Sequence, residues 1–418
     1  MRFYLLVALI SGVASFGGSY AVYRLSKRFK LYPGIRDRDV HTNPTPRLGG
    51  IAIVFGVAIS LAVASQISWF EGVFSDPFPI IAILLSAGVM LGVGVLDDLY
   101  DLNWMTKLAA QLIVAWFLAW SSVQIVSLPF GIDNGISLFG PTGFLILTVL
   151  AVVLVMNAVN FIDGLDGLVA GVTLIAGGVF FVYSYLLAID TSQTAFNLAS
   201  LVMAVLLGAV AGFLPFNWHP AKMFMGDGGA LVVGLLLAVS TITVTGQINP
   251  ASIDRSLLLP AFIPIALPFA ILIVPLLDFG LAVLRRLRAG KSPFSADRQH
   301  LHHRLLDMGH SHFHAVLIFY GWTAVVAFGA LLFLFVAWWW ALSAIALGLV
   351  VCTAVTLAPL SSRKRVEAAA QSAMDAPADV ARFDPLDAAA PPLDHEPDPD
   401  EAPASMISRG PRRAEETR

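Results

Sequence analysis

The chain contains long apolar runs without a single charge, and these runs restrict its fold more than any other feature. No residue between Ala315 and Ser362 is charged, and this stretch is long enough for two membrane helices of about 20 residues each. The whole chain is 57% hydrophobic and 13% charged, whereas soluble domains are about 45–50% apolar and about 25% charged. We therefore predict an all-α integral membrane protein.

Hydrophobic runs of membrane-spanning length recur along the first 360 residues. The first run follows Arg2, and we interpret it as an uncut span because no small-x-small cleavage site precedes the basic loop after it. The last two runs divide near Trp338, at an aromatic cluster typical of a membrane interface. The eleven predicted spans lie near 3–23, 48–66, 78–96, 107–126, 143–161, 167–188, 195–214, 229–247, 257–280, 315–336 and 339–359.

Lysine and arginine are distributed unevenly between the predicted loops. The loop 24–47 contains seven of them, whereas the loops 67–77, 127–142, 189–194 and 248–256 contain only Arg255. Cytoplasmic loops are enriched in Lys and Arg. We therefore expect the N-terminus outside, the basic loops in the cytoplasm, and the protein in a bacterial inner (cytoplasmic) membrane.

The C-terminal residues differ from the rest of the chain in composition and charge. Residues 366–408 carry a net charge of −9, which leaves +6 for the remainder because the whole chain carries −3. Such an acidic, Ala- and Pro-rich segment buries too little surface to fold. We predict a membrane domain over 1–360 and a disordered cytoplasmic tail over 361–418. The single cysteine, Cys352, offers no internal disulfide.

Four of the predicted cytoplasmic loops contain unusual sets of polar residues. The sets are Asp97-Asp98 with Lys107, then Asn157, Asn160, Asp163 and Asp166, then Phe224 and Asp227, and finally His300, His302, His303 and Arg304. Glycines flank several of the acids, where a backbone turns tightly or approaches a ligand. Because all four sets fall on the same predicted side, we expect one shared site.

Adjacent carboxylates at the end of a membrane helix require a compensating cation. The alternative for Asp97 and Asp98 is a solvated helix end, although the helix dipole disfavours acids there. Carboxylate and amide oxygens suit Mg²⁺ or Mn²⁺ rather than zinc. The histidines do not have zinc-site spacing; with Arg304 they suit a phosphate, or they form part of an ordinary basic loop.

With these loops in view, the chain resembles the polyprenyl-phosphate N-acetylhexosamine-1-phosphate transferases, which are multi-pass membrane enzymes of the glycosyltransferase 4 type. The resemblance covers about residues 1–360 and includes the segment from His41 to Gly50 with Arg47. It also includes the four sets above. The pattern His-x-His-His-Arg from His300 resembles the branch that uses UDP-N-acetylglucosamine and undecaprenyl phosphate. The phospho-N-acetylmuramoyl-pentapeptide branch has three consecutive histidines and stays an alternative.

The resemblance implies a role for each motif. Asp227 would bind Mg²⁺, with Asn160 near the metal or the nucleotide, and Asp97 or Asp98 would deprotonate or position the lipid phosphate. Phe224 would stack on uracil, and Lys107 would contact phosphate. We take Asp97, Asp98, Lys107, His300, His302 and His303 as catalytic candidates, Asn160, Asp163, Asp166, Phe224, Arg304 and Arg47 as substrate-binding candidates, and Asp227 and Asn160 as metal ligands.

The implied reaction transfers a sugar 1-phosphate from a UDP-sugar to the lipid phosphate, releases UMP and initiates a lipid-linked cell-envelope glycan. Such phosphoryl transfer depends on positioning and charge neutralisation, and we favour direct displacement over a covalent aspartyl intermediate. The expected partners are the two substrates and the membrane, with no nucleic acid, and a homodimer is an expectation from the family alone.

Two other classes of function remain open at this point. A transporter or flippase also contains acids within membrane helices, but it predicts polar residues near helix midpoints. A scaffolding protein that binds through its acidic tail would leave the four loop motifs unexplained. The sequence contains neither a Walker loop nor a dinucleotide fingerprint, which argues against an ATP-driven pump.

Overall fold

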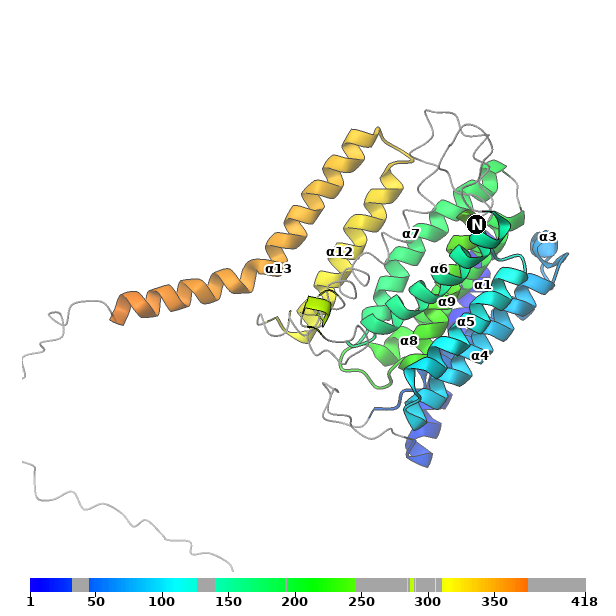
Figure 1. Cartoon of the computed structure of the whole chain (residues 1–418), viewed down its shortest axis with the longest axis horizontal. Helices are drawn as coiled ribbons and strands as arrows, with labels where there is room; N and C mark the ends of the chain where they lie inside the picture. Colours follow the sequence, from blue (N-terminus) through cyan, green and yellow to red (C-terminus); the bar gives the residue numbers. More distant parts are fainter. Residues whose placement is uncertain are drawn as a thin grey trace, which may run out of the picture. The chain divides into compact units, whose positions relative to one another are not determined.

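The structure is a computed structural model that describes residues 1–31, 45–125, 140–191, 194–245 and 310–374, with 284, 286–288, 290 and 305. Every regular element within these residues is helical, which confirms the predicted all-α class (Figure 1). The helices are α1 (Arg2–Phe29), α2 (Gly49–Ala64), η1 (Ser68–Phe70), α3 (Glu71–Phe74), α4 (Phe78–Tyr100), α5 (Trp104–Trp120), α6 (Pro141–Ile162), α7 (Leu168–Thr191), α8 (Thr194–Asn217), α9 (Gly226–Thr245), α12 (His312–Leu332) and α13 (Trp338–Met374).

Eight helices among the described residues are long and apolar enough to cross a membrane, or nine if a bent pair counts as one span. In that pair, α2 and the segment Ser68–Phe74 meet at an angle of 94°. The protein is thus a multi-pass membrane protein. The predicted span 257–280 lies outside the described residues, and the predicted sidedness stays a prediction.

Two predicted spans differ from the helices at their places. The span expected at 107–126 is the 17-residue helix α5, which ends at Trp120. At 1.5 Å per residue such a helix is about 26 Å long, shorter than a hydrocarbon core of about 30 Å. The span expected at 48–66 coincides with α2, whose direction changes sharply just after Ala64.

The last helix is longer than its predicted span. Helix α13 continues to Met374, so residues 361–374 of the predicted tail are helical. Residues 375–418, which contain most of that tail, lie outside the described residues. The chain divides into two compact units, 1–363 and 364–418, and the candidate site belongs to the first unit.

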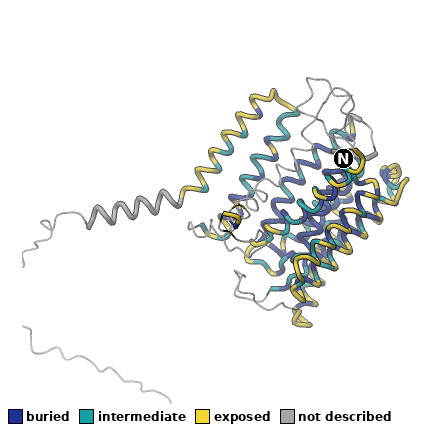
Figure 2. The backbone as a smooth tube through the Cα atoms, viewed as in Figure 1, coloured by how far each residue is buried: buried dark blue, intermediate teal, exposed yellow. Residues whose placement is uncertain are grey.

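Helix α9 lies at the centre of the bundle, where α2, α4, α6 and α8 pack against it (Figure 2). Its first turn approaches two neighbouring helices very closely at glycines. Gly94 of α4 lies so close to Gly228 that a methyl group on either residue would collide with the backbone of the other helix. Gly50 of α2 makes a similar contact with Gly229. These contacts bring the N-terminus of α9 against the ends of two other helices.

Candidate active site

The carboxylates of Asp97 and Asp98 lie on the last turn of α4 and are almost completely buried, with exposed fractions of 1% and 6%. The helix ends directly after them because Asp101 adopts a left-handed conformation with φ of 53°. The backbone then turns back, and the N–H of Leu102 donates to Asp97 Oδ1 at 2.8 Å. One oxygen of Asp97 is therefore fixed by the backbone, and its other oxygen faces the start of α5.

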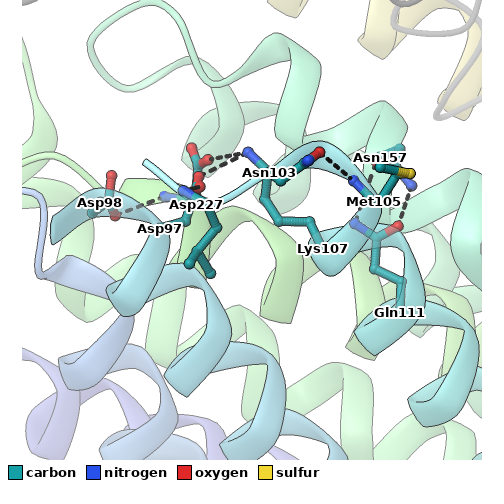
Figure 3. Close-up of polar contacts among 9 residues, drawn as sticks. Asp97, Asp98, Asn103, Met105, Lys107, Gln111, Asn157 and Asp227 are labelled. Atoms are coloured by element: carbon teal, nitrogen blue, oxygen red, sulfur yellow. Dashed lines mark hydrogen bonds and ion pairs between the residues drawn. The ribbon is translucent and has the colours of Figure 1, made fainter. Parts of the chain in front are cut away.

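Lys107 links Asp97 to a second acid from a distant part of the chain. Asn103 caps α5 by accepting the N–H of Met105 at 3.1 Å, and the helix places Lys107 in its first turn. Lys107 Nζ lies 2.9 Å from Asp97 Oδ2 and 3.8 Å from Asp227 Oδ2 (Figure 3). The carboxylates of Asp97 and Asp227 thus share one ammonium group.

Asp227 occupies the first turn of α9, where the positive end of the helix dipole favours an acid. Its own backbone N–H donates to Asp98 Oδ2 at 3.1 Å (Figure 3). Gly226 precedes it with φ of 75°, a left-handed conformation, and a side chain there would collide with the carbonyl of Arg47. Glycine is therefore required for Asp227 to approach α4 this closely.

Arg47 and Phe224 come together because their two chain segments are joined by backbone hydrogen bonds. The N–H of Phe224 donates to Pro46 O at 2.9 Å, and Phe224 O accepts the N–H of Gly49 at 3.0 Å. The N–H of Gly50 donates to Met225 O at 2.9 Å. The predicted N-terminal motif therefore lies beside the segment that leads into Asp227.

Two further predicted residues lie at the end of α6, Asn160 in its last turn and Asp163 just after it. Asn160 lies beside Asp227, and its buried Nδ2 makes no hydrogen bond of ordinary length within the described residues. Asp163 follows the helix directly. Removal from water raises the pKa of the Asp163 carboxyl to about 8, and the negative charges of Asp227 and Asp98 add to this shift while Arg47 opposes it. Asp163 therefore lies within electrostatic range of Asp227 and Asp98.

The structure also brings Asp166 to this end of the bundle, but with partners that sequence reasoning missed. Asp166 Oδ2 lies 2.8 Å from His219 Nδ1 and accepts the N–H of Ala221 at 3.1 Å. The buried side chain of Asn217 accepts the N–H of Gly167 at 3.0 Å and donates to Met223 O at 3.1 Å. His219 and Asn217 lie in the same polar segment as Phe224, and their place in that segment is the sequence feature that could have identified them.

The four remaining candidates, His300, His302, His303 and Arg304, lie outside the described residues. Within the residues that the structure describes, no group of three or more His, Cys, Asp and Glu side chains has the arrangement of a metal site. Among the described residues, the site thus contains carboxylates, one amide and two cations, Lys107 and Arg47. All of its acids lie at helix ends, which is not the midpoint location that a transporter predicts.

This arrangement suits a substrate that carries both a cation and phosphate groups. Within the described part of the chain, the acids Asp97, Asp98, Asp163 and Asp227 outnumber the two cations, so bringing a divalent cation to them lowers their mutual repulsion. The amide of Asn160 and the ammonium of Lys107 are donors that suit phosphate oxygens. The site can hold a metal–pyrophosphate group and neutralise charge on it.

Several known proteins resemble this chain over most of its length. The family model described as glycosyl transferase family 4 matches residues 80–245. The decaprenyl-phosphate N-acetylglucosaminephosphotransferase of Mycobacterium leprae is 38% identical over 333 residues, covering 78% of this chain and 82% of that relative. The probable undecaprenyl-phosphate N-acetylglucosaminyl 1-phosphate transferase of Bacillus subtilis is 32% identical, covering 68% and 72%. The undecaprenyl-phosphate alpha-N-acetylglucosaminyl 1-phosphate transferase of Escherichia coli K12 is 28% identical, with the same coverage.

Proposed function

This chain belongs to glycosyl transferase family 4, and from that premise we propose that it transfers N-acetylglucosamine 1-phosphate from a UDP-sugar to a polyprenyl phosphate. The names of its relatives, in which both the sugar phosphate and the lipid phosphate recur, support this assignment. The product is a lipid-linked diphosphosugar, and its formation is the first step in the synthesis of a cell-envelope glycan. The observation that carries the proposal is the contact of Lys107 with both Asp97 and Asp227.

The reaction requires few groups beyond those already in place. An oxygen of the lipid phosphate attacks the β-phosphorus of the donor, a new P–O bond forms, and the bond to the bridging oxygen breaks, so UMP leaves. Asp97 and Asp98 position the lipid phosphate or accept its proton. Asp98 Oδ2 also accepts the N–H of Asp227. Lys107 neutralises charge on the phosphates, since such transition states are stabilised mainly by positioning and electrostatics.

We propose Mg²⁺ as the cofactor, with Mn²⁺ as a substitute. Mg²⁺ usually takes one or two protein carboxylates and completes its shell with phosphate oxygens and water, so a group of three acidic or histidine ligands is not required. Asp227 and Asn160 would hold it. The metal would supply charge neutralisation for the pyrophosphate and the departing UMP. The raised pKa of Asp163 supports the proposal, because burial and, to a smaller extent, the charges of Asp227 and Asp98 disfavour its ionised form, and a bound cation would offset both.

The acceptor lipid and the membrane face are finer parts of the same proposal. Relatives that are 37–38% identical are named for decaprenyl phosphate, and the Bacillus relative is named for undecaprenyl phosphate. We propose a long polyprenyl phosphate of this kind as the acceptor, in a bacterial cytoplasmic membrane with the site facing the cytoplasm. Lys27 and Arg28 in the last turn of α1 support that orientation.

The experiment uses purified full-length protein in detergent with Mg²⁺, labelled UDP-sugars and either decaprenyl or undecaprenyl phosphate. We expect release of UMP and a labelled lipid product with UDP-N-acetylglucosamine, and loss of both after addition of a chelator. Absence of UMP release with every UDP-N-acetylhexosamine and both lipids would overturn the proposed function. Activity that persists in chelator would overturn only the metal assignment.

A further inference from the structure

Two amide side chains lie next to the candidate site but have no part in the reaction described above. Asn157 Nδ2 donates to Gln111 Oε1 at 2.6 Å, and Gln111 Nε2 donates back to Asn157 Oδ1 at 3.3 Å (Figure 3). The second hydrogen of Asn157 Nδ2 goes to Val153 O at 2.8 Å. The exposed fraction of Gln111 is only 3%. The two residues thus form a reciprocal amide pair between α5 and α6, in which Gln111 is buried and Asn157 is half-buried.

The amide pair is one helical turn from two residues of the site. Gln111 follows Lys107 by four residues on α5, and Asn157 precedes Asn160 by three residues on α6. Residues three or four apart share a helix face. The pair therefore lies on the same faces that present Lys107 to Asp97 and Asn160 to Asp227.

The rest of the buried face of α5 is apolar. The helix packs on α4 and α6, and its other buried residues are Val114, Ala115, Leu118 and Ala119, all apolar. Apolar packing is non-directional, whereas hydrogen bonds require defined distances and angles. A shift of α5 by a single residue would turn it by about 100° and remove Lys107 from the two carboxylates.

We propose that Gln111 and Asn157 are positioning residues, which fix the rotation of α5 against α6 and thereby hold Lys107 between Asp97 and Asp227. For its kinetic readout this inference rests on the proposed function. Interhelical hydrogen bonds in membranes contribute little to stability on average, because the separated helices also find partners. The expected consequence of the pair is therefore geometric, and it should be visible in turnover more than in unfolding.

The first test separates geometry from the satisfaction of buried polar groups. Gln111→Leu alone or Asn157→Leu alone leaves the other amide without its partner. The double Leu variant leaves no unpaired amide and can be as stable as the parent. We expect the double variant to unfold near the parent temperature but to lose about 10- to 100-fold in kcat, with an unchanged KM for the UDP-sugar. The exchanged pair Gln111→Asn with Asn157→Gln retains both amides and should recover most of kcat.

A second readout does not depend on catalysis. Cys352 is the only cysteine, so a Cys352→Ser background allows a single thiol at Lys107→Cys to be followed with a maleimide. We expect the double Leu variant to change the labelling rate of that thiol several-fold, and the exchanged pair to restore it. Parent-like kcat and labelling in the double Leu variant would overturn the positioning role. Absence of sugar-phosphate transfer by the parent protein would instead overturn the proposed function. The labelling rate would still test the rotation of α5.

Discussion

Helices α9 and α13 are both apolar and long enough to span a membrane, yet they differ completely in burial. The membrane-length part of α9 has a mean hydropathy of 1.8 and is 89% buried, whereas that of α13 has a mean hydropathy of 2.3 and is 6% buried. The more hydrophobic helix is therefore the peripheral one (Figure 2). In this protein hydropathy identifies spans but does not identify the core.

Small and polar residues on α9 favour its packing at the centre of the bundle. Lipid tails are as apolar as leucine, so apolar side chains alone do not draw a helix into a bundle. Helix α9 contains Gly228 and Gly229, which allow close backbone contact, and the buried hydroxyls of Ser240, Thr241 and Thr243. Small and polar residues are what favour helix association in membranes. The same helix begins with Asp227, so the centre of packing is also the centre of the site.

The largest expected effect concerns Asp227, and it tests whether α9 carries the chemistry. Asp227→Asn removes the charge that would hold the metal and that faces Lys107, while the side chain keeps its size. We expect turnover to fall on the order of 10³-fold, since metal-based charge stabilisation contributes several kcal/mol. Ser343→Ala on exposed α13 is the matched control and should leave UMP release unchanged. An Asp227→Asn protein with parent-like activity at ordinary Mg²⁺ would contradict the assignment of Asp227.

The second prediction tests the difference in burial directly with the same substitution on both helices. Leu235 of α9 is fully buried, and Leu347 of α13 has an exposed fraction of 67%. Leu235→Ala creates a cavity and should lower the free energy of unfolding by about 2–5 kcal/mol, whereas Leu347→Ala should change it by less than about 0.5 kcal/mol. Thermal unfolding in detergent measures both, and equal losses would show that α13 is covered by protein.

The third prediction concerns the glycine contact between α4 and α9. Gly94→Ala should separate the helices and cost about 1–3 kcal/mol in stability, as overpacking does, with a matching fall in turnover because Asp97 and Asp98 move away from Asp227. Gly88→Ala is the matched control, since a methyl group there has no neighbour within 4 Å. Unfolding and UMP release are measured together. Equal behaviour of the two variants would mean that the helices do not approach at Gly94.

The smallest expected effect is a pH dependence of the Mg²⁺ requirement. The pKa of Asp163 is raised to about 8, so a proton occupies this carboxyl below that pH and must leave when a cation binds nearby. The Mg²⁺ concentration for half-maximal rate should therefore fall as pH rises from about 6.5 to 8, by at most about tenfold per pH unit for one proton. Asp163→Asn should flatten this slope, whereas the exposed control Asp76→Asn should not. An identical slope in Asp163→Asn would assign the proton elsewhere.

Much of the fold could be predicted because its signals are local. Charge-free runs located α12 and α13, and acids beside glycines located the ends of α4 and α6 and the start of α9. The predicted site residues Asp97, Asp98, Lys107, Asn160, Asp163 and Asp227 lie together because each stands at a helix end, and antiparallel neighbours bring those ends to one side of the bundle.

The remaining features depend on contacts that periodicity does not encode. The hydropathy of residues 121–126 is high enough to extend a span, but α5 ends at Trp120, where Ser121 hydrogen-bonds back to Leu118. The pairing of Gln111 with Asn157 joins residues 46 positions apart, and no local pattern indicates it. The partnership of His219 with Asp166 likewise arises from tertiary structure.

The serine face of α1 has a consequence for biosynthesis. Ser11, Ser15 and Ser19 are fully buried, and Ser11 Oγ donates to Val205 O of α8. Helix α8 begins only at Thr194, so at ordinary rates of translation α1 emerges on the order of 10 s or more before this partner exists. During that interval the hydroxyl of Ser11 lacks this acceptor. Helix α1 thus reaches its final environment only after α8 has been made, and mutations on this face would reduce yield before they reduced activity.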